Sequence, residues 1–240
     1  MPGGVAGSAV CRATAREQQG WLAAALGALA VEPAVRVWEY TAPAVVLGCS
    51  QRPSADLTRR AAAAGVPVFV RQTGGGAVLA GPWMLGATVV LPPRHPLVAT
   101  SIPQSYRWFG VAHAAWLQGI GVDARAVPHA AASLDPTASW ACFASLAPWE
   151  VEAGGGKIVG LAQARRRNGI AFSSAALIAP PPWELLCDVL EKPRTHAATL
   201  ARRTSSCSQI VGRRAAADTL ARSLLARLAA HAAAPRSPST

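Results

Sequence analysis

The chain has 240 residues, of which 51% are hydrophobic, and its formal net charge is +11. This length and apolar content are enough to bury a sizeable core, so we expect one α/β or α+β domain rather than two small ones. The positive charge calls for a negatively charged partner, such as an acidic protein, a nucleic acid or an anionic membrane surface. Five scattered cysteines without a Cys-x-x-Cys pair argue against a disulfide framework or a zinc site and indicate reduced thiols in the cytoplasm.

In the first half, the apolar run at 21–31 is too short to span a bilayer, so we predict a buried helix over 15–31 and no membrane partner. Two strands are predicted at 35–40 and 44–48, and the short segment 41–43 between them indicates a hairpin. Ser54 is a suitable N-cap for a helix that ends near Gly65. A strand at 66–71 then leads into a glycine-rich loop, and a strand at 84–91 leaves it.

In the second half, a helix over 104–118 carries Trp108, Ala112 and Trp116 at four-residue steps, which is typical of a face buried in the core. The short strands predicted after it make this half largely antiparallel; they lie at 140–143, 149–152, 157–163 and 169–178. A helix begins near Trp183, after three prolines, and another covers 215–231. We expect a single domain over residues 1–232 and a disordered tail over 233–240.

Two glycine-rich segments stand out because each lies beside a strand-like run. They are Arg71-Gln72-Thr73-Gly74-Gly75-Gly76-Ala77-Val78 and Gly154-Gly155-Gly156-Lys157-Ile158-Val159-Gly160-Leu161-Ala162-Gln163. Consecutive glycines beside a strand cost backbone entropy, so they are plausible where the chain bends sharply or offers its amides to a ligand. Because one segment carries an arginine and the other a lysine, the two together predict a site for an anionic or activated acyl group.

Lys157 is one of two lysines, whereas arginine supplies 21 of the 23 cationic residues. An arginine stays protonated in proteins, but a desolvated lysine can change its charge or act as a compact point charge. A lysine inside the glycine motif, in a chain that otherwise uses arginine, therefore indicates a chemical role.

Four segments occur in a fixed order between residues 35 and 178. They are Leu47-Gly48-Cys49-Ser50-Gln51, the first glycine segment, Ala141-Cys142-Phe143 with Trp149-Glu150-Val151, and the run from Lys157 to Arg166. Together they resemble the lipoate-protein ligase A and cysteine-dependent octanoyltransferase branch of the biotin/lipoate protein ligase superfamily. The resemblance implies an α+β fold with a mixed, mostly antiparallel sheet flanked by helices, of the class II synthetase-like kind. It also implies that a lipoyl or octanoyl group is attached to a lysine of a lipoyl carrier domain.

The resemblance also implies roles for individual residues. Lys157 would hold the acyl carbonyl or acyl-phosphate oxygen, where a cation stabilises the negative charge that grows during acyl transfer. Cys142, in a Cys-Phe pair fifteen residues before that lysine, would be the nucleophile of a transferase. The expected substrate-binding residues are Arg71, Gly74, Gly75, Gly76, Ala77, Gly160 and Gln163. The alternative for Cys142 is a buried strand cysteine without a chemical role.

Two chemistries fit this resemblance. A ligase would use ATP with Mg²⁺ to activate lipoate as an acyl-adenylate, and the target lysine would displace AMP. A cysteine-dependent octanoyltransferase would take the acyl group from an acyl carrier protein and would need no cofactor. In both cases the expected partner is an acidic lipoyl carrier domain. The arginines at 165–167 form either a solvated turn or a docking patch for this domain.

The sequence departs from the family pattern at three places, which leaves other hypotheses open. Val70 replaces a first arginine, Ala80 replaces a histidine, and Ser173-Ser174-Ala175 replaces a His-Gly pair. A second hypothesis is therefore a non-catalytic member that binds an acyl group or a carrier domain. A third is a basic nucleic-acid-binding domain, which the lack of RNA motifs and zinc-finger spacing disfavours.

Overall fold

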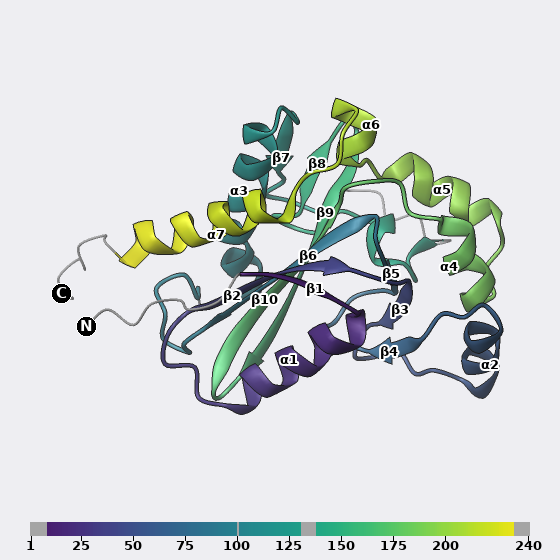
Figure 1. Ribbon diagram of the computed structural model, residues 1–240, viewed down its shortest axis with the longest axis horizontal. Coiled ribbons are helices and arrows are strands. Elements are labelled where there is room, and N and C mark those ends of the chain that lie inside the picture. Colours follow the sequence, from purple (N-terminus) through teal and green to yellow (C-terminus); the bar gives the residue numbers. More distant parts are fainter. Residues whose placement is uncertain (1–8, 100, 131–137, 233–240) are drawn as a thin grey trace.

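The computed structural model describes residues 9–99, 101–130 and 138–232. In these residues the main sheet has the strand order β1-β2-β6-β10-β9-β8-β7 (Figure 1). Within it β1 pairs with β2 in parallel, and the other neighbouring strands pair antiparallel. The α+β prediction, with a mixed and mostly antiparallel sheet, is therefore confirmed.

The three longest strands, β6, β9 and β10, form the middle of the main sheet. Its strands are β1 (Val10–Ala13), β2 (Ala34–Tyr40), β6 (Met84–Leu91), β7 (Ala124–Ala126), β8 (Val151–Ala153), β9 (Gly156–Arg166) and β10 (Gly169–Leu177). Ser173 of β10 stands opposite Ala162 of β9, and Ala175 stands opposite Gly160. Successive side chains of a strand point to opposite faces, so these four residues share one face of the sheet.

A second, smaller sheet carries the first glycine segment. Its order is β4 (Val68–Val70), β3 (Ala44–Leu47) and β5 (Val78–Ala80), with β3 in the centre. Residues 71–77, which we call the glycine loop, connect the two outer strands. The loop is therefore held at both ends by hydrogen-bonded strands.

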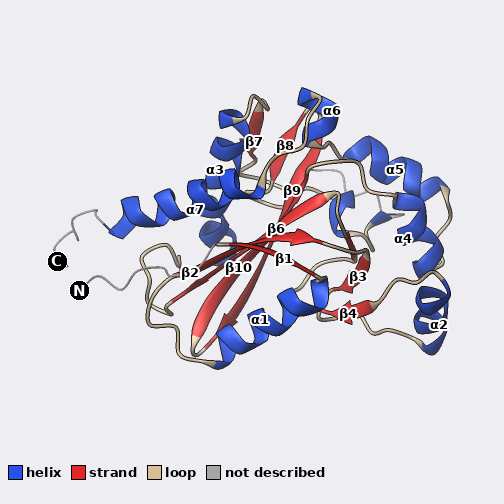
Figure 2. Cartoon of the chain, in the orientation of Figure 1, coloured by secondary structure: helices blue, strands red, loops and turns tan. Residues whose placement is uncertain are grey.

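Helices cover both faces of the main sheet, as Figures 1 and 2 show. They are α1 (Ala15–Gly27), α2 (Ala55–Ala63), α3 (Ile102–Gly119), α4 (Trp183–Leu190), α5 (Thr195–Arg203), α6 (Cys207–Val211) and α7 (Ala217–Ala232). Helix α1 lies on one face, and α3 and α7 lie together on the other. Ser54 caps α2 as predicted, since its side chain accepts a hydrogen bond from the Leu57 amide at 3.1 Å.

The predicted face of α3 is buried, which confirms the periodicity argument. Trp108, Ala112 and Trp116 are all buried, and Trp108 packs edge-on against Phe172 of β10. Aromatic side chains bury large apolar areas, so this contact joins α3 firmly to the middle of the sheet.

Two predicted elements are wrong in detail. β2 and β3 do not form a hairpin, because β2 pairs with β1 and β6 whereas β3 pairs with β4 and β5. The predicted strand at 140–143 is instead a bridge at Ala141 followed by the 3₁₀ turn η2 (Cys142–Ala144). The predicted tail at 233–240 lies outside the described residues, and the 1–232 domain boundary stays a prediction.

Candidate active site

The glycine loop and the Cys142 turn are joined by backbone hydrogen bonds. The Ala77 amide donates to the Trp140 carbonyl at 2.8 Å, and the Cys142 amide donates to the Ala77 carbonyl at 2.9 Å. Gly76 lies against this junction. A Cβ atom at that position would stand 2.6 Å from the Trp140 oxygen and 2.8 Å from the Cys142 nitrogen. A glycine is therefore required here for the two segments to come together.

Replacing Gly76 with alanine should displace the Cys142 turn, because backbone atoms rather than flexible side chains meet the new methyl group. We expect a loss of about 1–3 kcal/mol in the free energy of unfolding, as is typical for an added methyl group in a packed site. Gly74→Ala is the matched control, since a Cβ atom there meets nothing within 4 Å. Urea denaturation of both variants measures the difference, and equal stability would show that the junction is loose.

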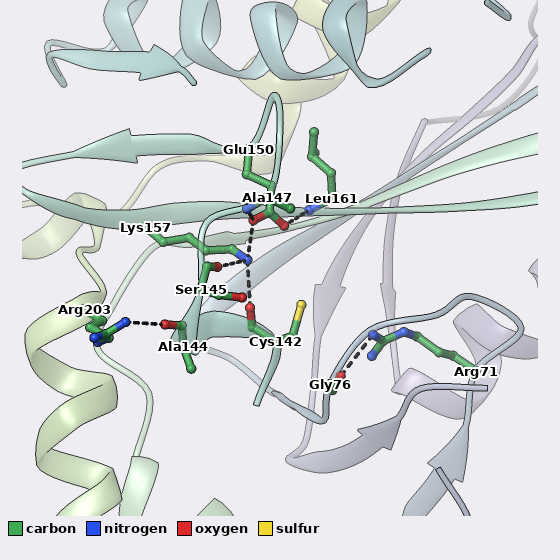
Figure 3. Close-up of polar contacts among 10 residues, drawn as sticks. All are labelled: Arg71, Gly76, Cys142, Ala144, Ser145, Ala147, Glu150, Lys157, Leu161 and Arg203. Atoms are coloured by element: carbon green, nitrogen blue, oxygen red, sulfur yellow. Dashed lines mark hydrogen bonds and ion pairs between the residues drawn. The ribbon is translucent and has the colours of Figure 1, made fainter. Parts of the chain in front are cut away.

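The Arg71 side chain is hydrogen-bonded to backbone carbonyls of the glycine loop. Its guanidinium donates to the Gly76 carbonyl at 3.0 Å (Figure 3). It also donates to the carbonyls of Gly74 at 2.6 Å and Val46 at 3.4 Å. The residue is only 8% exposed, and no carboxylate in the described part of the chain forms an ion pair with it. Arg71 is thus a buried cation that is solvated by carbonyl dipoles but not neutralised.

Lys157, by contrast, is neutralised. Its ammonium lies 2.6 Å from a carboxylate oxygen of Glu150, and both side chains are 3% exposed. The same ammonium donates to the carbonyls of Cys142 at 2.8 Å and Ser145 at 3.0 Å (Figure 3). An ammonium has three N–H donors, so all of them are used, and two fix the turn that carries Cys142.

Both carboxylate oxygens of Glu150 accept hydrogen bonds. The sequence analysis assigned no role to this residue. Its carboxylate accepts from the Ala147 amide at 2.7 Å and from the Leu161 amide at 3.0 Å. Trp149, just before it, has a φ of 69°, a backbone conformation that bulky residues rarely adopt. The chain therefore accepts local strain where it delivers the Glu150 carboxylate to the lysine.

Gly160 makes room for this ion pair. A Cβ atom at residue 160 would lie 3.3 Å from Cε of Lys157 and 3.7 Å from Oε1 of Glu150. Gly160 also lines a pocket. The ion pair thus lies directly behind the wall of that pocket.

The pocket lies between α1 and the sheet and has a cavity volume of about 70 Å³. Cys142 and Arg71 both line it, and they are joined there by residues from α1, β2, β9 and β10, including Leu22, Tyr40, Gly160 and Ser173. The walls are mostly apolar, and no described lining residue is acidic. The pocket therefore suits an uncharged chain with a reactive group near Cys142.

A buried serine and histidine stand beside the pocket. His113 lies 2.8 Å from the Phe109 carbonyl through Nδ1 and 2.8 Å from the Ser174 hydroxyl through Nε2. Because a carbonyl only accepts, Nδ1 carries the proton and Ser174 donates to Nε2. Burial lowers the pKa of His113 to about 4, so the ring is neutral and a poor proton acceptor. We interpret this pair as a satisfied core contact.

The remaining predicted site residues differ in whether they line the pocket. Gly160 lines the pocket, whereas Gly74, Gly75, Gly76 and Ala77 do not. Gly74 and Gly76 give their carbonyls to Arg71, and Ala77 is bonded to the Cys142 turn. Gln163 accepts from Arg165 at 2.9 Å and also lies outside the pocket lining. Their roles in substrate binding stay predictions.

The predicted turn at 165–167 is only partly solvated. Arg165 donates to the Ala99 carbonyl at 2.9 Å and to the Ser105 hydroxyl at 2.7 Å, so it fixes the start of α3, whereas Arg166 and Arg167 are exposed. Among the described residues, no group of three or more His, Cys, Asp or Glu side chains gathers as a metal site. No helix in the described part of the chain has the length and hydropathy needed to cross a membrane.

The described residues thus form a mixed sheet with helices on both faces, with a glycine loop and a buried lysine behind the wall of an apolar pocket. Residues 13–229 match the family model described as the lipoyl protein ligase A/B catalytic domain. The chain belongs to this family, which confirms the resemblance.

Relatives and solved structures agree with this assignment. The chain is 30% identical over 177 residues to octanoyltransferase LipM of Kyrpidia tusciae, covering 72% of this chain and 64% of that protein. It is 32% identical to octanoyltransferase LipM of an Exiguobacterium species, covering 58% and 52%. The alignments thus span only about half to two-thirds of these curated relatives.

Two solved structures share the fold at low identity. A bi-partite lipoate protein ligase from Thermoplasma acidophilum, described with its E2 lipoyl domain, has a TM-score of 0.66 and 17% identity and covers 93% of this chain and 82% of that one. A lipoate-protein ligase A bound with ATP has a TM-score of 0.63 and 21% identity and covers 88% and 77%. At these identities the likeness supports the class II synthetase-like fold and nothing further.

Proposed function

We propose that this protein transfers an octanoyl or lipoyl group through the Cys142 thiol to a lysine amine of a lipoyl carrier domain. The observation that carries the proposal is the position of Cys142, whose side chain lines the apolar pocket between α1 and the sheet. A nucleophile at the wall of such a pocket is suited to an acyl chain that lies inside it. The octanoyltransferase names of two relatives support the same chemistry.

The reaction has two balanced steps. In the first, the Cys142 thiolate attacks the carbonyl of an acyl thioester on a donor carrier, which forms a thioester on Cys142 and releases the carrier as a thiolate that takes a proton from solvent. In the second, the deprotonated lysine amine of the lipoyl domain attacks that thioester, which forms an amide and frees the Cys142 thiol. Each step exchanges one acyl bond for another, so neither requires an oxidant or a nucleotide.

Lys157 and Glu150 serve the first step by shaping the turn. The Lys157 ammonium holds the carbonyls of Cys142 and Ser145, so the reactive side chain has a fixed backbone. The arrangement restricts where the sulfur can lie relative to the pocket, which is the positional part of catalysis. Contact of the ammonium with a substrate oxygen would require it to give up one of its three bonds.

We propose a lipoyl domain as the partner, and the description of the Thermoplasma acidophilum neighbour together with its E2 lipoyl domain is consistent with this choice. A lipoyl domain of acidic surface would also be attracted to a chain with a net charge of +11. This attraction should weaken as salt is added, because screening shortens the range of the field.

The proposal is tested by mass spectrometry after incubation with an octanoyl carrier protein. We expect the wild type to gain one octanoyl group on Cys142, and Cys142→Ala to gain none. Cys49→Ala is the matched control, because Cys49 is a free and exposed cysteine outside the pocket lining. An adduct that survives in Cys142→Ala would contradict the thioester route.

The role of ATP is decided in the same assay with a purified lipoyl domain as acceptor. We expect transfer from the thioester donor without ATP. Transfer from free lipoate that requires ATP and Mg²⁺ and is unaffected by Cys142→Ala would instead identify a ligase. An adduct on Cys142 that never passes to the lipoyl domain would favour the non-catalytic binding protein.

A further inference from the structure

Helix α5 lies along the turn that carries Cys142. Near the start of the helix, Nδ1 of His196 accepts a hydrogen bond from the indole of Trp140 at 3.2 Å, and Trp140 stands two residues before Cys142. At its end, Arg203 donates to the carbonyl of Ala144 at 3.0 Å, two residues after Cys142 (Figure 3). The helix therefore contacts the chain on both sides of Cys142.

The exposed surface along α5 is basic. The helix has no acidic residue, and Arg202 and Arg203 lie in its last turn. Just before the helix, the Lys192 ammonium lies 5.9 Å from the centre of the Trp140 ring. In the described part of the chain, neither Lys192 nor Arg202 forms an ion pair with a carboxylate. We call Trp140, Lys192, His196, Arg202 and Arg203 the α5 strip.

The carboxylates that precede α5 in the chain have partners of their own. Asp188 pairs with Arg194 at 2.9 Å, and Glu191 pairs with Arg60 at 3.0 Å. Since each of these charges is balanced by its own arginine, they leave the positive charge of Lys192 uncompensated.

A cavity of about 180 Å³ lies at the end of the α5 strip. It is lined by Arg202 and Arg203 and by residues 143–146, which follow Cys142. Its one described carboxylate, Glu152, accepts from Arg125 at 2.7 Å. A side chain of a docked partner therefore has a place to enter directly beside the Cys142 turn.

We infer that the α5 strip is the surface on which an acidic protein domain docks, and that this domain is the lipoyl carrier domain. The inference rests on the proposed function, which requires a carrier lysine to reach Cys142. Opposite charges on the two surfaces speed association and fix the orientation of the partner. Trp140 is half-buried, so part of its ring is available, and tryptophan and arginine are the residue types that most often dominate interface energies.

The structure disfavours the other docking patch that the sequence suggested, at 165–167. Arg166 ends β9, whereas Lys157, which binds the Cys142 carbonyl, lies nine residues earlier on the same strand. At about 3.3 Å per residue, these two positions are about 30 Å apart. A domain docked at Arg166 would therefore be far from Cys142, whereas a domain docked on α5 would lie beside it.

The first test is cross-linking with a water-soluble carbodiimide, in a mixture of the wild-type protein and a purified lipoyl domain without any acyl donor. The reagent joins a carboxylate to an amine that touches it, forming an amide while the carbodiimide takes up water and becomes a urea. Lys192 is one of only two lysines, and the other, Lys157, is buried. We expect peptide mass spectrometry to find Lys192 joined to an acidic residue of the lipoyl domain. Lys192→Arg keeps the charge but lacks the amine, so it should give no cross-link at this position.

The second test measures the dissociation constant for the lipoyl domain by calorimetry, at low and at physiological salt. Lys192→Glu and Arg202→Glu each reverse one charge of the α5 strip, and we expect each to weaken binding about fivefold, with a smaller effect at higher salt. Arg166→Glu is the matched control, because it makes the same change of charge at the far end of β9. It should weaken binding by less than about twofold, since screening limits its reach.

Three outcomes would overturn the inference. The first is equal weakening by Arg166→Glu and Lys192→Glu, which would show that the attraction is diffuse. The second is unchanged binding in both Lys192→Glu and Arg202→Glu, in proteins whose thermal unfolding is that of the wild type. The third is binding of a DNA duplex that depends on Lys192 and Arg202 while the lipoyl domain stays unbound, which would identify a nucleic acid as the partner.

The two tests also separate this inference from the proposed function, because neither requires acyl transfer. A cross-link at Lys192, in a protein that never acylates the lipoyl domain, supports the docking surface and refutes the transfer. Acylation that depends on lipoyl-domain concentration in the same way in the wild type and in Lys192→Glu/Arg202→Glu refutes the docking surface alone.

Discussion

Lys157→Met should lower the free energy of unfolding by about 3–5 kcal/mol, which is the usual cost of removing one partner of a buried ion pair. The reason is that the Glu150 carboxylate, on a side chain that is 3% exposed, would keep two backbone amides as partners. It would lose the only cation within ion-pair distance in the described structure. Guanidinium denaturation at neutral pH measures the loss.

A second variant shows whether the charge or the side-chain volume is responsible. Lys157→Met/Glu150→Gln removes both charges of the buried pair, and the new amide side chain keeps an acceptor for the backbone, so we expect most of the stability to return. Arg222→Met is the control, because Arg222 and Asp218 form an exposed pair on α7 and such pairs contribute about 0–1 kcal/mol. If Lys157→Met is as stable as the wild type, the pair is solvated and our account of it is wrong.

The double variant also bears on the mechanism. Because it should be folded but lacks the ammonium, its transfer rate reports what Lys157 contributes beyond stability. A rate near that of the wild type would leave Lys157 with a positioning role only. A lost rate with normal alkylation of Cys142 would support the role that the family resemblance assigns to Lys157, at the acyl oxygen.

Local sequence patterns predicted single helices and strands correctly where the signal lies within the element itself. They did not predict which strands pair. The strand over 84–91 agrees with β6 residue for residue, because a short, mostly apolar run between turns is typical of a buried strand. The segment 41–43 misled us, because a short link between two strands is typical of a hairpin, whereas β2 and β3 enter different sheets. Their pairing depends on β1, β4, β5 and β6, which no local pattern reveals.

In the site, too, the sequence indicates residues but not the contacts between distant segments. The sequence indicated Arg71, Cys142 and Lys157, since residue type and motif spacing are visible in it. It did not indicate that Glu150 neutralises Lys157, because the two residues lie on different segments, seven positions apart, without a helical or strand period that would join them. That contact depends on the positive φ of Trp149 and on the small Gly160, which are features of the folded backbone.

Gly110→Ala should be among the most destabilising substitutions of a glycine in this chain. A methyl group there would overlap the carbonyl oxygen of Trp149, which packs directly against α3. Trp149 already has a strained backbone, so it cannot move away without carrying Glu150 out of reach of Lys157. We expect a loss of about 3 kcal/mol or more, at the upper end for an overpacked site.

Gly20→Ala, in the middle of α1, is the matched control for this substitution. Gly20 is exposed and a Cβ atom there meets nothing within 4 Å, so alanine should stabilise the helix by about 0.5–1 kcal/mol. The same chemical change is therefore expected to have opposite signs in two helices, as measured by thermal and urea unfolding. If Gly110→Ala also stabilises the protein, α3 does not pack against the Trp149 carbonyl as described. The position of Glu150 beside Lys157 would then not depend on α3.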